Sequence, residues 1–215
     1  LPMMTCPSNT SVCIDGASIT LAGATPSGGT YSGAGVSAGV FTPSTAGVGT
    51  HTITYTATDV NGCSNTCTFS ITVNALPAMT CPGNQTACLN DAAITLSSLS
   101  GTNPTGGTFS GPGVSAGVFT PVTAGVGTHT ITYTATNGNG CSNTCTFSIT
   151  VNGLPTITVG TVSCDLPLSL NTYTVNFTSD ASNVTSTTGT VTYNAGVGTV
   201  TGVPVGTNIT LTATG

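Results

Sequence analysis

The sequence predicts an all-β protein made of small antiparallel β-sandwich modules that are joined in tandem as a rod. Three observations support this. Residues 46–74, AGVGTHTITYTATDVNGCSNTCTFSITVN, return at residues 124–152 with only Asp59-Val60 replaced by Asn137-Gly138. Apolar residues and threonines alternate in this stretch with a period of two residues. Short strand-like runs recur between Gly, Asn and Ser turns, and no segment has a helical period.

The repeated stretch predicts a β-hairpin with a polar outer face. In its first half, threonines alternate with His51, Ile53, Tyr55 and Ala57. After the turn residues 60–62, threonine and serine alternate with Cys67, Phe69, Ile71 and Val73. Because successive side chains of a strand point to opposite faces, we expect the apolar set to face a core and the hydroxyl set to face solvent.

The first module is predicted to span residues 1–75, and it opens with an irregular segment that carries Cys6 and Cys13. Two short strands should precede the hairpin, separated by Gly-rich turns, since many glycines cost too much entropy inside a regular element. In order, the expected elements are the strand 18–21, the bend 25–29, the strand 30–32, the loop 33–39 and a lead-in at 40–43.

Residues 76–153 repeat the first module, and residues 154–215 form a third module of a different kind. The second module has three extra residues around 99–103, which we place in a surface loop because every other landmark is kept. The third module has one cysteine, Cys164, and we expect it to be truncated, with the partner of Cys164 beyond Gly215. The Leu-Pro junctions between modules should make the rod stiff, because proline fixes φ.

The composition excludes two classes of partner. The chain of 215 residues has no Lys or Arg, five acidic residues and a formal net charge of -5, so it cannot neutralise the phosphates of nucleic acid. It also has no polybasic patch for anionic lipid, and its apolar runs fall short of the roughly 20 residues that span a bilayer. We predict no nucleic-acid binding and no membrane insertion. A mean hydropathy of +0.34 indicates that the chain folds.

Nine cysteines in a short repeated frame indicate an oxidising compartment and disulfides. The pairing could be local, Cys6 with Cys13 and Cys63 with Cys67, or nested, Cys6 with Cys67 and Cys13 with Cys63. Nested loops should constrain the unfolded chain by about 4 kcal/mol, against roughly 2 to 3 kcal/mol for very short loops. Loop entropy favours the nested pairing, and both remain open on this argument.

The first two modules resemble a known kind of repeat. The residues that carry the resemblance are Cys13, Gly28-Gly-Thr-Tyr-Ser-Gly33, Gly39-Val-Phe-Thr-Pro43, Ala46-Gly-Val-Gly-Thr-His-Thr-Ile-Thr-Tyr55 and Asn61-Gly-Cys63. This pattern is similar to the immunoglobulin-like or PKD-like repeats of very large surface proteins of gliding Bacteroidota, notably gliding-motility adhesins. Cys6-Pro7 with Cys67-Thr-Phe69 resembles the hyalin-type repeat, in which a Cys-Pro near the start bridges to the last strand.

Both resemblances imply tandem immunoglobulin-like sandwiches and the nested pairing. In the second module they imply Cys81 with Cys145 and Cys88 with Cys141, and Cys164 should be unpaired within this chain. Proteins of this family are exported to the cell surface as long chains of modules, and they act as adhesins or filament stalks. Because Leu1-Pro2 matches the later junctions and no signal peptide opens the chain, we expect a piece of a longer protein.

Two motifs that could suggest catalysis are interpreted as structural. Gly35-Val-Ser37-Ala-Gly39, repeated around Ser115, matches the nucleophile-elbow pattern, but that chemistry needs a following helix and an activating His and acid. His51 and His129 lie on the inward face of the predicted strand, where one structural hydrogen bond is expected. We predict no catalytic residues.

Metal binding is predicted to be absent as well. Asp59 becomes Asn137 in the second copy, and a repeated calcium site would not lose its charge in this way. Cys63 and Cys67 occur once per module without a second matching pair, which argues against zinc. We expect no metal-binding or cofactor-binding residues and no cofactor.

The sequence therefore predicts a non-catalytic stalk or filament repeat of a secreted bacterial cell-surface adhesin. Its partners would be neighbouring modules of the same chain and other copies in a filament. Two alternatives stay open: the threonine faces could bind carbohydrate or ice, or the modules could be accessory modules of a secreted enzyme.

Overall fold

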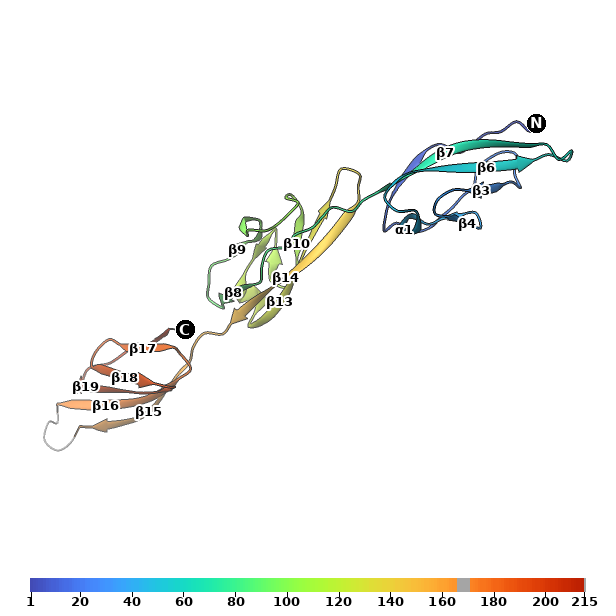
Figure 1. Cartoon of the computed structure of the whole chain (residues 1–215). Coiled ribbons are helices and arrows are strands. Elements are labelled where there is room, and N and C mark those ends of the chain that lie inside the picture. The colour runs from blue at the N-terminus through green and yellow to red at the C-terminus, as the bar shows by residue number, and fades with distance from the viewer. Residues whose placement is uncertain (166–170, 215) are drawn as a thin grey trace. The chain divides into compact units, whose positions relative to one another are not determined.

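The computed structural model describes residues 1–165 and 171–214, and most of its regular structure is β-strand. The predicted all-β class is confirmed. The elements of the first repeat, residues 1–75, are β1 (Thr10–Cys13), β2 (Ile19–Thr20), β3 (Thr30–Ser32), β4 (Val36–Ser37), β5 (Val40–Phe41), α1 (Pro43–Ala46), β6 (Gly49–Thr58) and β7 (Ser64–Asn74) (Figure 1).

The seven strands of the first repeat form an immunoglobulin-like sandwich. One sheet has the order β1-β7-β6-β3, and the other has the order β2-β5-β4. β6 and β7 form the predicted hairpin and pair antiparallel along their length. β1 departs from the expected antiparallel pattern, because it pairs parallel to β7 and places Cys13 opposite Asn74.

The core of this repeat follows the predicted alternation. Phe41 and Ile53 are fully buried, and Tyr55 is 2% exposed. A fully buried side chain of this size contributes about 1.5–3 kcal/mol. The Tyr55 hydroxyl donates to the carbonyl of Pro26 at 2.6 Å and accepts from the backbone N–H of Gly29 at 2.7 Å. Thus one buried tyrosine holds the Gly-rich bend against the hairpin.

Two short elements differ from the sequence-based prediction. Val36 and Ser37 form the strand β4 inside the loop predicted at 33–39, and the one-turn helix α1 begins at Pro43, the last residue of the predicted lead-in. Pro43 begins α1, where a fixed φ suits the first helical position, and Gly47 follows it with φ +83°. Helix α1 connects β5 to β6 and interrupts neither sheet.

The second repeat, residues 76–153, has the same two sheets, ordered β10-β13-β14-β8 and β11-β12-β9. Its inserted residues follow a short 3₁₀ helix and lie in a loop, as expected for an insertion that spares the sheets. The elements are β8 (Gln85–Cys88), β9 (Ile94–Thr95), η1 (Leu96–Ser98), β10 (Thr108–Ser110), β11 (Val114–Ser115), β12 (Val118–Phe119), α2 (Pro121–Ala124), β13 (Gly127–Thr136) and β14 (Ser142–Asn152).

The third segment, residues 154–215, has a sheet ordered β15-β16-β19-β18 and a second sheet of only two strands, β17 and β20, among its described residues. Its core contains Phe177, Val200 and Val203, each at most 2% exposed. The elements are β15 (Ile157–Cys164), β16 (Thr172–Ser179), β17 (Asn183–Ser186), β18 (Thr190–Asn194), β19 (Val197–Pro204) and β20 (Leu211–Thr214).

By its internal contacts the chain divides into two compact units. The first comprises Leu1–Gln85, Ala93–Thr120 and His129–Ile149, and the second comprises Thr86–Ala92, Pro121–Thr128 and Thr150–Gly215. Every sheet nevertheless stays within one of the ranges 1–75, 76–153 and 154–215. The division into three modules and their arrangement as a rod stay predictions.

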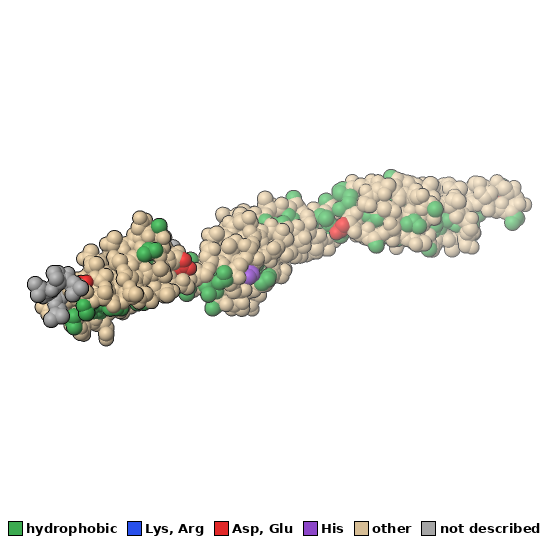
Figure 2. Space-filling view, turned by 90° about the horizontal axis from the view of Figure 1, so that it is seen from below, with side chains coloured by type: hydrophobic (Ala, Val, Ile, Leu, Met, Phe, Trp, Pro, Cys, Tyr) green, Lys and Arg blue, Asp and Glu red, His purple; other side chains and the backbone are tan. Residues whose placement is uncertain are grey.

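The surface is dominated by uncharged polar groups and backbone, with few acidic side chains in view (Figure 2). Within the part of the chain that the structure describes, no helix has the length and apolar character needed to cross a bilayer.

Candidate functional site

Each repeat has a leading end, where the chain enters, and a trailing end, where the chain leaves. In the first repeat the Asn65 side-chain amide donates to the carbonyl of Pro2 at 2.8 Å, which holds the start of the chain beside the β6–β7 turn. Cys63 lies in this turn, immediately before β7. Cys13 lies at the other end of β7, opposite Asn74. The leading end therefore carries Cys63 and the trailing end carries Cys13.

This geometry corrects the nested pairing of the inner cysteines. Between Cys63 and Asn74 lies the length of β7, 11 residues, which amounts to about 36 Å of extended strand. A disulfide needs Cα atoms about 4.4–6.8 Å apart, so Cys13 cannot reach Cys63 in the folded repeat. The second repeat has the same register, because Leu89 N–H donates to the carbonyl of Asn152 at 2.9 Å.

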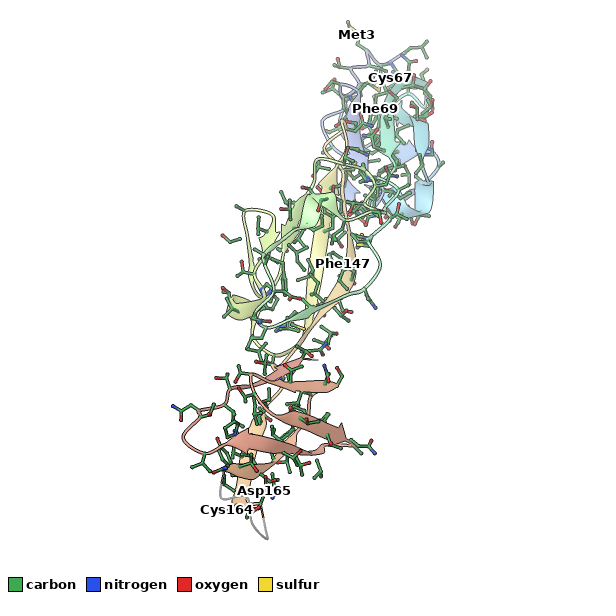
Figure 3. The ribbon with its side chains drawn as sticks, turned by 90° about the vertical axis from the view of Figure 1, so that its left-hand side faces the viewer. Met3, Cys67, Phe69, Phe147, Cys164 and Asp165 are labelled. Atoms are coloured by element: carbon green, nitrogen blue, oxygen red, sulfur yellow. A yellow bond between two sulfur atoms is a disulfide. The ribbon has the colours of Figure 1, made fainter. Side chains whose placement is uncertain are left out.

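The outer cysteines form bonds within each repeat. Cys6 bonds to Cys67 and Cys81 bonds to Cys145, with Cα atoms 5.8 Å apart in both cases. These two bonds match the nested pairing, and the structure contains neither of the local alternatives. Cys67 lies on β7 two residues before the core residue Phe69 (Figure 3), so the bond ties the incoming chain to the edge of the core.

The inner cysteines instead join the two repeats. Cys13 bonds to Cys141, with Cα atoms 5.6 Å apart, where Cys13–Cys63 and Cys88–Cys141 had been expected. Beside this bond, the Asn137 side-chain amide donates to the carbonyl of Ala75 at 2.9 Å. We call Cys13, Ala75, Asn137 and Cys141 the joint. Cys63 and Cys88, expected to be bonded, are free, and so is Cys164.

The β6–β7 turn and its copy are held by the side chain that precedes them. Asp59 Oδ1 accepts from the N–H groups of Asn61 and Cys63 at 2.9 Å each. Asn137 Oδ1 makes the corresponding bonds in the second repeat, and its amide nitrogen is left to donate to Ala75. Both are Asx-type turns. The exchange of Asp59 for Asn137 therefore keeps the turn and adds a donor at the joint.

The other acidic and cysteine side chains do not gather into a metal site. Among residues 1–165 and 171–214, no three His, Cys, Asp or Glu side chains lie close enough together to hold a metal ion. Asp91 Oδ2 accepts from the N–H of Cys88 at 2.7 Å, which fits a role in shaping the loop after β8.

The outer face of the hairpin is a continuous ladder of hydroxyl groups. Every outward-facing cross-strand pair of β6 and β7 consists of threonine or serine: Thr50 with Thr72, Thr52 with Ser70, Thr54 with Thr68, Thr56 with Thr66, and Thr58 with Ser64. The first and last pairs are hydrogen-bonded through their hydroxyls, at 3.1 and 2.8 Å. β3 widens this face, since Thr30 lies opposite Thr56. We call this surface the hydroxyl face.

The residues that match catalytic patterns lie in structural positions. Ser37 ends β4, and Ala38 and Gly39, with φ of 48° and 77°, turn directly into β5. A nucleophile elbow requires a helix at this point. His51 Nε2 lies 2.8 Å from the carbonyl oxygen of Gly47, which confirms the single structural hydrogen bond predicted for it. The ring of His129 lies 6.2 Å from that of Phe119 in the second repeat.

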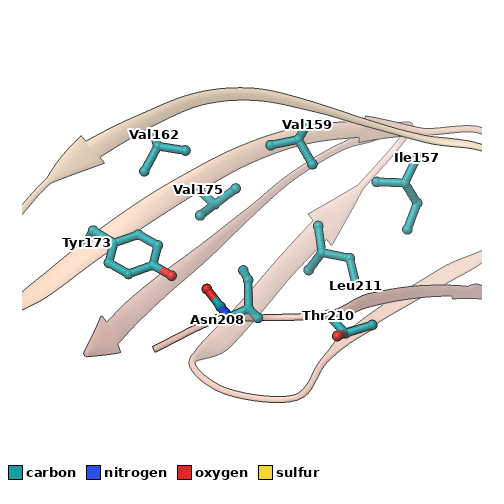
Figure 4. Close-up of a pocket in the computed structure, with 9 residues that line it drawn as sticks. Ile157, Val159, Val162, Tyr173, Val175, Asn208, Thr210 and Leu211 are labelled. Carbon is teal, nitrogen blue, oxygen red and sulfur yellow. The ribbon is translucent and has the colours of Figure 1, made fainter. Parts of the chain in front are cut away.

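The third segment has an open groove of about 700 Å³ whose lining side chains are mostly apolar. It lies between β15 and the approach to β20, and Figure 4 shows its side chains, among them Val159, Val162, Tyr173 and Leu211. A bulge in β15 places both Val159 and Val162 opposite inward-facing residues of β16. They remain 57% and 59% exposed, because the two-stranded sheet covers this side of the core only in part.

Two aspartates of the third segment are held in the charged form by hydrogen bonds. The hydroxyls of Thr174 and then Thr172 donate to Asp165 and lower the pKa of its carboxyl below the ordinary value of 3.8. For Asp180 the backbone N–H of Thr156 is the main cause, and its pKa is lowered too. Asp165 directly follows Cys164 at the end of β15 (Figure 3).

Sequence reasoning missed the joint, because it assumed that each module closes on itself. The feature that would have indicated the joint is the direction of the strand that carries Cys13. Each repeat has an inner cysteine near its start and another in its hairpin turn, and the pairing depends on the direction of the strand after Cys6. A strand parallel to the last strand carries Cys13 away from the turn. The periodic pattern of apolar residues does not show strand direction.

A family model described as the HYR domain, an immunoglobulin-like cell-adhesion domain, matches residues 1–73. This match and the three disulfides indicate an adhesion-type extracellular repeat. No curated protein matches the chain.

Solved structures similar to the chain include Protocadherin Gamma B7 extracellular cadherin domains 1–4, with 15% identity and a TM-score of 0.29, covering 92% of this chain and 66% of that one. Sidekick-1 immunoglobulin domains 1–4 has 14% identity and a TM-score of 0.25, covering 73% and 53%. The insect immune protein hemolin has 13% identity and a TM-score of 0.27, covering 94% and 69%. The chain spans less than two thirds of the length of the first two.

Proposed function

We propose that this chain is a stalk segment of a secreted bacterial cell-surface adhesin, and that its role is to span distance without catalysing a reaction. The observation that carries this proposal is the joint. In the first repeat the chain enters at one end of a long hairpin and leaves at the other, and Cys13–Cys141 then bonds this trailing end to the next repeat. A pull along the chain would be borne by sheets and covalent bonds.

The surface chemistry supports an extracellular role. Solubility comes from hydroxyl and amide groups, since the chain has no Lys or Arg, so its folding should depend little on salt. The same composition offers trypsin no cleavage site. Disulfides that hold each repeat and the joint suit an oxidising environment. The HYR match supports an adhesion protein, and the resemblance to gliding Bacteroidota adhesins supports a bacterial cell surface.

The partners that fit this proposal are further modules of the same long chain and other copies in a filament. Small-angle X-ray scattering of the full chain tests the spanning role. Three modules with strands of about 34 Å, placed end to end, give a radius of gyration of about 30 Å, whereas one compact globule of this length gives about 17 Å. A value near that of the globule contradicts the stalk.

A second candidate function is supported by the hydroxyl face. Its five cross-strand pairs are uninterrupted. Hydroxyls spaced about 4.8 Å across strands and about 6.8 Å along them form a regular, neutral array. Such an array suits carbohydrate or ice.

Glycan-array binding and ice-recrystallisation assays on the full chain test this candidate. The matched variant replaces the central pair in both repeats by valine, which keeps the shape and β-propensity of threonine: Thr54→Val, Thr68→Val, Thr132→Val and Thr146→Val. Thr192→Val, on an exposed position of β18, is the control. Binding that the variant loses and the control keeps would favour this function. No binding by the parent chain would eliminate it.

A further inference from the structure

We propose that Cys63 is the open half of another inter-repeat disulfide, and that its partner is the trailing-end cysteine of a further repeat of the same type, placed directly before Leu1. This inference rests on the joint and not on the stalk function. If it fails, the spanning role keeps its own test by scattering.

The comparison of the two hairpin turns carries the proposal. Gly62-Cys63-Ser64-Asn65-Thr66-Cys67 and Gly140-Cys141-Ser142-Asn143-Thr144-Cys145 are identical in sequence. Both turns are held by the same Asx bonds, and both later cysteines bond to the start of their own repeat. Yet Cys141 is 1% exposed and bonded, whereas Cys63 is exposed and free.

The difference between the two turns is what precedes them. Cys141 is preceded by a repeat whose trailing end presents Cys13, and the start of each repeat is held at its own turn by the same contact, Asn65 to Pro2 and Asn143 to Pro77. A chain that arrives at Leu1-Pro2 from another repeat would therefore arrive beside Cys63, as the first repeat arrives beside Cys141. A repeat with this geometry and an exit cysteine supplies the missing thiol.

Cys88, the trailing-end cysteine of the second repeat, shows that this bond needs a following module with a cysteine at its leading end. Cys88 lies at the trailing end of the second repeat, and the segment after it carries one cysteine, Cys164. Cys164 ends β15, about 23 Å of strand from Ile157 at its start. The third segment thus presents no cysteine where it begins, and Cys88 is left free.

The bond would form by thiol–disulfide exchange with a small disulfide such as oxidised glutathione. The two cysteine sulfurs form one S–S bond, the S–S bond of glutathione breaks, and both electrons and protons pass to two glutathione thiols. Cys63 is exposed, so the exchange has access to it.

The test adds a copy of residues 1–75 in front of Leu1 of the full chain, which recreates the Ala75-Leu76-Pro77 junction as Ala75-Leu1-Pro2. After refolding with oxidised and reduced glutathione, non-reducing peptide mapping with a protease other than trypsin should recover the added Cys13 bonded to Cys63. The free thiols should number three, as in the chain itself, because only the added copy's own turn cysteine replaces Cys63. Two further thiols, with Cys63 among the free ones, would overturn the proposal.

Two controls keep the result decisive. Cys13→Ser in the added copy should leave Cys63 free and raise the thiol count by one. Recovery of the bond between the added Cys6 and Cys67 shows that the added copy is folded.

A second version, with residues 76–153 as the added copy, offers Cys88 as the trailing-end cysteine and should bond it to Cys63. If both folded versions leave Cys63 free, the inference is wrong.

Discussion

The turns around Cys63 and Cys141 have almost the same sequence and opposite fates. One cysteine is solvent-exposed and free, and the other is buried in a disulfide between repeats. The two turns share their Asx bonds and strand register, so local structure does not separate them. The comparison teaches that the state of a turn cysteine in this protein depends on the neighbouring repeat.

The largest effect should come from removing the disulfide that each repeat forms within itself, between its start and its last strand. Cys6→Ser with Cys67→Ser opens a loop with a sequence separation of 61 residues, and should lower the free energy of unfolding of the first repeat by about 4 kcal/mol. Cys81→Ser with Cys145→Ser should cost the second repeat nearly the same, since the separation is 64 residues. Urea titrations measure both. A clear difference between the two costs would show that the repeats are not equivalent inside.

A smaller and equally symmetric loss is expected from the buried tyrosines. Tyr55→Phe removes a hydroxyl that donates to Pro26 and accepts from Gly29. Tyr133→Phe removes the same pair of bonds, to Pro104 and Gly107. Each change should cost about 1–3 kcal/mol, because a part-buried carbonyl and N–H lose their partner. Thermal unfolding measures the loss, and unchanged stability in either variant would contradict the assigned contacts.

The disulfide of the joint should become easier to reduce when the side-chain amide of Asn137 is removed. Asn137→Asp keeps the oxygen that holds the turn and removes the amide that donates to Ala75. Losing this hydrogen bond should cost the joint about 1 kcal/mol, which makes the equilibrium constant for reduction of Cys13–Cys141 roughly fivefold more favourable. Equilibration in glutathione buffers, followed by peptide mapping, measures it.

Asp59→Asn is the matched control, since the first turn has the same Asx bonds and a free cysteine. It should leave the reduction of Cys13–Cys141 unchanged. An equal effect of both substitutions would show that the turn, and not the bond to Ala75, sets the stability of the joint.

The smallest expected effect is a pH dependence of stability in the third segment, which the two repeats are not expected to share. Hydrogen bonds lower the pKa of Asp165 and of Asp180 below 3.8 in the folded state. A lowered folded pKa adds stability that is present above the unfolded pKa and is lost as pH falls through the folded value. The third segment should therefore melt at a lower temperature as pH falls below about 4.

Calorimetric scans from about pH 5 to about pH 2 follow this loss. Asp165→Asn with Asp180→Asn should remove most of it. Because Asp180 is exposed and Asp165 is only partly buried, the shift should be small, and an opposite sign would contradict the assigned hydrogen bonds.

The local elements could be predicted from the sequence because they depend on patterns of a few residues. The alternation of Ile53, Tyr55 and Ala57 with threonine predicted both the strand and its buried face, which the structure confirms. The repeat predicted that each landmark would return in the second copy. The hydroxyl face followed from the same period, although its continuity became clear only when β6 and β7 were placed in register.

The sequence by itself determined the all-β class, the hairpin and its two faces, because these follow from a period of two residues and from short-range turn chemistry. The outer disulfides were implied by the resemblance to hyalin-type repeats, since loop entropy alone left the pairing open. Only the tertiary structure decided the pairing of the inner cysteines. The parallel direction of β1 along β7 moves Cys13 to the end of the repeat away from its own turn, and strand direction leaves no mark on the alternation of side chains.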